Sequence, residues 1–113
     1  MRRLGPCLIA VLAAGLLLSA APARAAGSPE RIGAFAGAMR WCQERLPGPD
    51  ARYRRARLRA AQELEGMDRR ERARAVAGRD RAFENGRFLG ERLDRRSCDR
   101  LVRASEWSRY AGD

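Results

Sequence analysis

The 113-residue chain contains no histidine, no lysine and no threonine. Without histidine, it lacks the residue that most often serves as a general base and as a ligand for transition metals. The sequence also has no glycine-rich phosphate loop, no paired zinc cysteines and no calcium-binding loop. A small enzyme would need a carboxylate site that the sequence does not display. We therefore expect no metal, no cofactor and no catalytic activity.

The first 25 residues have the pattern of a cleavable secretory signal. Two arginines follow the first methionine, residues 4–23 carry no charge, and Ala23 and Ala25 place small residues before a cleavage site. We expect cleavage after Ala25 and export to the periplasm or the cell exterior. The alternative is a retained membrane anchor at residues 4–23, because 20 uncharged residues can just span a bilayer.

Removal of the signal leaves residues 26–113, enough for a single helical domain with a modest core. This part keeps 21 arginines against 14 acidic residues, a formal net charge of +7. The positive excess favours an anionic partner. Nucleic acid is not the expected partner, because export separates the chain from most of the cell's nucleic acid and no nucleic-acid-binding motif is present.

Two cysteines, Cys42 and Cys98, remain after processing. An even pair in a small exported domain predicts a disulfide. The closed loop would hold 57 residues counted with both ends, and the chain-entropy estimate for such a loop is up to about 4 kcal/mol. A redox-active or intermolecular pair is less favoured, because catalytic cysteines usually lie two residues apart.

Hydrophobic periodicity predicts an all-α fold, a small bundle of about four helices. The first helix should begin at Ser28 and end before the Pro-Gly-Pro of residues 47–49, and the second should begin after Asp50 and stop at Gly66. Their expected inner faces are Ile32, Phe35, Ala36, Met39, Cys42 and Leu46 in the first helix, and Tyr53, Ala56, Ala60 and Leu64 in the second.

The third helix should begin at Asp68, which has the spacing of a capping box with Glu71. Two ends remain open, one near Leu93 and one at the Asn-Gly pair of residues 85–86. The fourth helix should begin at Asp94 or Ser97. Its expected inward residues are Cys98, Leu101, Val102 and Ser105. No segment alternates with period two, so we expect negligible strand content.

Both cysteines fall on inner faces, so the first and last helices should pack together. Two glycine pairs at four-residue spacing, Gly33/Gly37 and Gly86/Gly90, predict a tight crossing of the first helix against the third. An alternative is that these glycines reflect the base composition of the gene and have no structural role.

Five arginines fall within eight residues of the second helix, and no acidic residue lies among them. They are Arg52, Arg54, Arg55, Arg57 and Arg59. They occupy the first half of the helix, where the dipole disfavours cations. Two interpretations remain open. The run is either an ordinary solvated face or an anion-binding face for acidic protein, lipid headgroups or polysaccharide.

Three large aromatic residues, Trp41, Phe88 and Trp107, lie off the expected inner faces. Broad helix faces could still bury them, since large aromatic side chains are usually buried. Otherwise they are exposed anchors for a protein partner.

Together these features predict an exported, non-catalytic protein-binding module, such as an inhibitor, an immunity factor or a chaperone-like accessory. Its partner would be another envelope or secreted protein. The alternative is a cationic binder of lipopolysaccharide, anionic lipid or cell-wall polymer that acts through the arginine-rich second helix.

Overall fold

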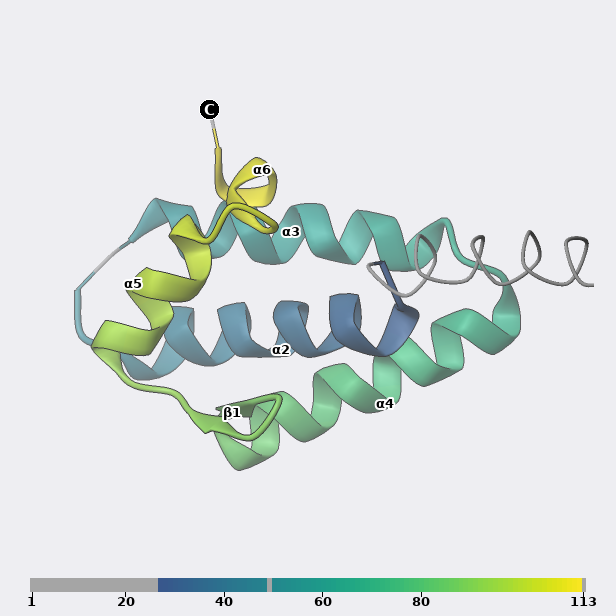
Figure 1. Ribbon diagram of the computed structural model, residues 1–113, viewed down its shortest axis with the longest axis horizontal. Helices are drawn as coiled ribbons and strands as arrows, with labels where there is room; N and C mark the ends of the chain where they lie inside the picture. The colour runs from purple at the N-terminus through teal and green to yellow at the C-terminus, as the bar shows by residue number, and fades with distance from the viewer. Residues whose placement is uncertain (1–26, 49, 113) are drawn as a thin grey trace, which may run out of the picture.

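The computed structural model describes residues 27–48 and 50–112, so the predicted signal segment and its cleavage site lie outside the described residues. The described chain forms five helices and one short hairpin (Figure 1), and the all-α prediction is confirmed. The helices are α2 (Pro29–Arg45), α3 (Ala51–Glu65), α4 (Arg69–Asn85), α5 (Arg95–Arg103) and α6 (Ser108–Ala111). The hairpin pairs β1 (Arg87–Phe88) with β2 (Glu91–Arg92) in antiparallel register.

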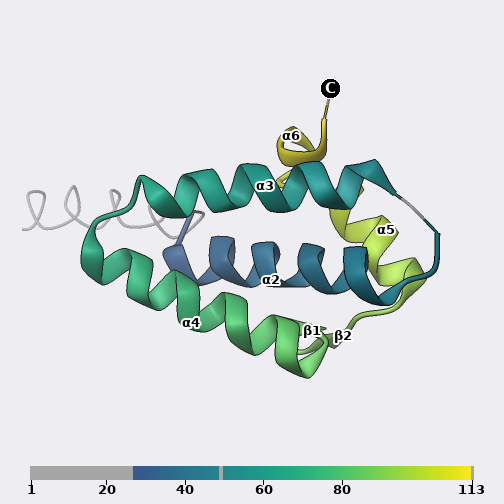
Figure 2. The ribbon, with the colours of Figure 1, turned by 180° about the vertical axis from the view of Figure 1, so that it is seen from behind.

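Helix α2 lies at the centre, with α3 along one side and α4 along the other (Figure 1). It packs most extensively against α4 and next against α3, whereas α3 and α4 contact each other little. Helix α5, the hairpin and α6 lie over one face of this three-helix layer, and the view from behind shows the opposite face (Figure 2). Among the described residues, none of the helices is long and apolar enough to cross a bilayer.

Side-chain caps set the starts of the four longer helices. Ser28 Oγ accepts from the Arg31 N–H, and Asp50 accepts from the N–H two residues on, as predicted. The predicted capping box at Asp68 is present. A second capping box starts α5, where the Ser97 N–H donates to Asp94 and lowers the pKa of its carboxyl. Asp94 is therefore the N-cap of the fourth helix, which begins at Arg95 and has Ser97 as its third residue.

Helix α4 ends at Asn85, which resolves the open alternative for the third helix. Gly86 adopts a left-handed conformation with φ of 64°, which stops the helix and starts the hairpin. Strand content in the described chain is negligible, as expected, because the hairpin has only two residues in each strand. The expectation that Ser105 faces inward is wrong, since α5 ends at Arg103 and Ser105 is exposed.

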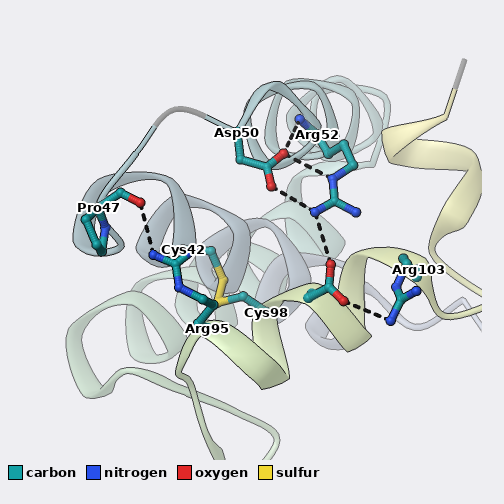
Figure 3. A network of polar contacts seen from close by, with 8 residues as sticks. Cys42, Pro47, Asp50, Arg52, Arg95, Cys98 and Arg103 are labelled. Carbon is teal, nitrogen blue, oxygen red and sulfur yellow. Dashed lines mark hydrogen bonds and ion pairs between the residues drawn. A yellow bond between two sulfur atoms is a disulfide. The ribbon is translucent and has the colours of Figure 1, made fainter.

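The predicted disulfide joins Cys42 of α2 to Cys98 of α5, with a Cα–Cα distance of 6.0 Å (Figure 3). Both cysteines are buried, so the bond lies inside the core. Such a bond is compatible with an oxidising compartment. The first helix and the fourth therefore lie together, as their inner faces predicted.

The α2–α4 crossing depends on glycine. A Cβ atom on Gly33 or Gly37 would overlap the backbone carbonyl of Ala75 or Arg79 in α4. From the other side, a Cβ on Gly78 would lie 2.8 Å from the Glu30 carbonyl oxygen. The predicted tight crossing is thus present.

The prediction that Gly86 and Gly90 form the α4 side of this crossing was wrong. Gly86 and Gly90 have φ angles of 64° and 93° and lie at the end of α4 and in the hairpin turn. The glycine of α4 that faces α2 is Gly78, which has no glycine partner at four-residue spacing.

Candidate binding groove

Four members of the arginine run are bound to other groups of this chain. Arg52 pairs with Asp50 at 2.8 Å and with Asp99 of α5 at 3.0 Å (Figure 3). Its hydrogen bond holds the pKa of the Asp50 carboxyl below its usual range. These two carboxylates offset the unfavourable position of Arg52 at the positive end of the α3 dipole.

Arg55 and Arg59 hold the end of the chain. The Arg55 Nε donates to the Ala111 carbonyl oxygen at 2.9 Å. Arg59 donates to the carbonyl oxygens of Arg109 and Gly112 at 2.8 and 3.0 Å. Both arginines therefore act as a clamp that keeps α6 on α3. Arg57 donates to the Gln43 side chain at 2.8 Å, and Arg54 is exposed.

The aromatic residues do not form the exposed anchors considered above. Trp107 is only 3% exposed, and its ring stacks on Phe35 with 4.2 Å between centroids. Phe88 is also buried, edge-on to Trp107. Of the two alternatives, burial therefore holds for both residues: Trp107 lies in the segment that follows α5, and Phe88 lies in β1 of the hairpin. Trp41 is half-buried, with its indole nitrogen beside Gly86.

Tyr110 completes this aromatic cluster. Its ring centroid lies 5.3 Å from that of Phe35. Burial raises the pKa of Tyr110 to about 12, with the Glu63 carboxylate as a second cause. The cluster is therefore a stability element, and the described residues offer no exposed aromatic platform there.

A groove of about 480 Å³ lies between α3 and α4, over α2. Its lining residues all belong to α2, α3 and α4. Its apolar side chains, called the floor below, are Ala36, Ala61, Leu64 and Val76. Its charged side chains, called the rim below, are Arg40 and Glu44 of α2, Arg57 and Glu65 of α3, and Arg72 and Arg79 of α4. We call this feature the arginine groove.

Two rim arginines carry charge that no carboxylate of the described residues offsets. Arg57 on the α3 wall donates to the neutral Gln43 amide. Arg72 at the start of the α4 wall donates to the backbone carbonyls of residues 64 and 65 at the end of α3 and of residue 67 in the turn that follows, at 3.0 to 3.2 Å. These contacts fix both side chains while leaving their positive charge available to a ligand.

The other two rim arginines are in weak ion pairs. Arg40 pairs with Glu44 at 3.0 Å and lies over the Phe83 ring at 4.1 Å, and Arg79 pairs with its neighbour Asp80 at 3.0 Å. Exposed pairs of this kind contribute about 0 to 1 kcal/mol. A carboxylate of a ligand could therefore replace either acid at little cost.

Of the residues proposed from the sequence, only Arg57 lines the groove. The others were missed, although a signal for them exists. Residues 36, 40 and 44 of α2, 57, 61 and 65 of α3, and 72, 76 and 79 of α4 each recur at helical spacing. Each set forms a stripe beside the buried face of its helix.

A second hollow of about 890 Å³ lies near the start of α2 and is bordered by Glu30, Glu63, Glu71 and Arg74. Gly27, the first described residue, also borders it. We assign no function to this hollow.

Within the described part of the chain, histidine, cysteine and acidic side chains form no group of three or more suited to a metal ion. Comparison with protein-family models, with curated proteins and with solved structures gives no significant match.

Proposed function

We propose that the domain is an exported, non-catalytic binding protein that holds a segment of another envelope or secreted protein in the arginine groove. The observation that carries this proposal is the groove itself, an apolar floor between two walls of arginine. Ligand sites are typically concave, with an apolar lining and a few placed polar groups. An inhibitor, an immunity factor or a chaperone-like accessory would each use such a surface.

The geometry favours the groove over the alternative of an anionic-surface binder acting through α3. Asp50 and Asp99 offset the charge of Arg52, and the contacts of Arg55 and Arg59 with residues 109–112 hold these two side chains outside the groove. A broad anionic surface would also gain nothing from a recessed apolar floor. Arg57, another member of the run, contributes its charge to the groove.

Site-specific photocrosslinking in the producing cells tests the proposal. A photoreactive phenylalanine analogue is placed at Ala61, which lines the groove, and as a control at Ala77, which is exposed on the outer side of α4. We expect one discrete protein adduct from position 61 and none from position 77. No adduct at position 61, or the same adducts at both positions, would contradict the proposal.

A charge-reversal pair sharpens the test. Arg57→Glu with Arg79→Glu reverses one charge on each wall of the groove. Arg70→Glu with Arg81→Glu makes the same change of net charge on exposed positions of α4 outside the groove. The first pair should abolish the adduct and the second should leave it. Equal loss in both would mean that net charge alone drives the contact.

A further inference from the structure

We infer that the segment bound by the arginine groove is an amphipathic helix with acidic residues on both flanks of its apolar stripe. This inference rests on the proposed function and specifies its ligand. It follows from the arrangement of three helices, from the backbone groups that a bound peptide would carry, and from the charges on the two walls.

The three-helix layer leaves the place of a fourth helix open. Helices α3 and α4 both pack on α2 but contact each other little, so the groove follows the space between them. Its lining extends over residues 36–44 of α2, 57–65 of α3 and 72–79 of α4. At 1.5 Å per residue each stretch covers roughly 10 to 12 Å, or about two helical turns. A docked helix would complete a four-helix arrangement.

An extended peptide fits this groove poorly. The walls and floor are helices whose backbone groups are already hydrogen-bonded within each helix. An extended strand would therefore find no sheet edge to pair with, and its own N–H and C=O groups would face the apolar floor unpaired. A helix satisfies those groups internally. The three- and four-residue spacing of the lining also matches the ridges of a packed helix.

The side chains of the groove specify the surface of that helix. Ala36 and Ala61 are small and permit a close approach, while the half-buried Val76 offers apolar contact beside the buried Leu64. Arg57 lies on the α3 wall and Arg72 and Arg79 lie on the α4 wall, so carboxylates are needed on both sides of the apolar stripe. The four arginines and two glutamates of the lining give a formal charge of +2, which an acidic helix complements.

Synthetic peptides of about 18 residues, or five turns, test this assignment on the processed, oxidised protein. One has leucine and alanine on one face with glutamate on both flanks, a second has the same composition in permuted order, and a third has lysine in place of glutamate. Fluorescence anisotropy should show the first binding at least about tenfold more tightly than the second. The third should not bind. Circular dichroism should show a gain of helix when the first peptide binds.

The same charge-reversal pairs locate the site. Arg57→Glu with Arg79→Glu should weaken binding of the acidic amphipathic peptide at least about tenfold, and Arg70→Glu with Arg81→Glu should leave it within about twofold. Equal binding of the permuted peptide would overturn the helical assignment in favour of simple charge attraction. Tighter binding to vesicles of phosphatidylglycerol and phosphatidylcholine, lost in the groove variant, would assign the groove to lipid instead.

The peptide and crosslinking experiments separate the two proposals. A discrete adduct at position 61 without peptide binding would retain the binding function and reject the acidic helix. Absence of both would reject the groove as a binding site.

Discussion

The close approach of α2 to α4 makes a specific prediction for the glycines between them. In Gly33→Ala, the new methyl group would overlap the backbone carbonyl of Ala75 in α4. This carbonyl is fixed by the helix and cannot rotate away. The two helices must then separate along a crossing that contributes the most extensive packing in the described chain. Gly37 meets the Arg79 carbonyl in the same way.

Two effects of opposite sign determine the magnitude. Alanine in place of glycine favours a helix by about 1 kcal/mol, whereas overpacking of a tight contact typically costs about 1 to 3 kcal/mol. The overlap here is with backbone, so we place the overpacking cost at or above the upper end of that range. We therefore expect Gly33→Ala to lower the free energy of unfolding by about 2 kcal/mol or more. For a domain of this size, about 2 kcal/mol corresponds to a fall in Tm of roughly 8 to 16 °C.

Gly66 provides a matched control. It ends α3 with φ of −82°, and a Cβ there would meet its nearest atom at an ordinary 3.6 Å. Gly66→Ala should be neutral or stabilise by up to about 1 kcal/mol. Urea and thermal unfolding of the oxidised proteins, followed by circular dichroism, measure both changes. A Gly33→Ala protein as stable as the parent would refute the packing argument.

Three further predictions concern the disulfide, the tyrosines and the clamp. Reduction of the buried disulfide should lower the free energy of unfolding by up to about 4 kcal/mol, measured by urea unfolding with and without reductant; an unchanged midpoint would contradict its role in the core. Tyr53 and Tyr110, the two tyrosines of the chain, both have a raised pKa because of burial, that of Tyr110 to about 12. Since unfolded tyrosine titrates near about 10, stability should be unaffected by them below that pH. It should fall as the pH rises toward 12, with Tyr110 accounting for about 2 to 3 kcal/mol; phenolate absorbance that appears near pH 10 in the folded protein would contradict this. Arg59→Ala removes two hydrogen bonds to the end of the chain and should cost about 1 kcal/mol, whereas Arg54→Ala should stay within about 0.5 kcal/mol; equal effects in urea unfolding would argue against a clamp.

The helices could be predicted because their signals are local. Ser28, Asp50 and Asp68 cap the helices that follow them within a few residues, and the stripe through Cys42 identifies a buried face. The disulfide could be predicted because, after removal of the signal, only one pairing remains within the chain. These predictions required only residues that are close together in the sequence, or the number of cysteines.

The features of the fold that could not be predicted depend on contacts between segments far apart in the sequence. Trp107 reaches the core because the chain turns back after α5, and no periodicity encodes that reversal. Arg55 meets the carbonyl of Ala111, a partner 56 residues away. Gly78 lacks a paired glycine, so its contact with α2 becomes apparent only when both helices are placed.

The arginine groove was missed for a related reason. Its stripes on three helices are each unremarkable, since each combines one alanine or valine with two charged residues. They become a site only because α3 and α4 both pack on α2 and leave the space between them open. Sequence spacing could have identified the three stripes, but it could not have shown that they face one another.

Amide chemical-shift mapping of the isotope-labelled, oxidised protein, titrated with the acidic amphipathic peptide, tests the groove most directly. The largest shifts should fall on the lining residues of α2, α3 and α4, with Ala61 and Val76 among them. Among residues 27–48 and 50–112, two large apolar side chains, Leu58 and Leu89, are exposed elsewhere, at 41% and 57%. Shifts centred on either leucine, with the groove unchanged, would contradict the account.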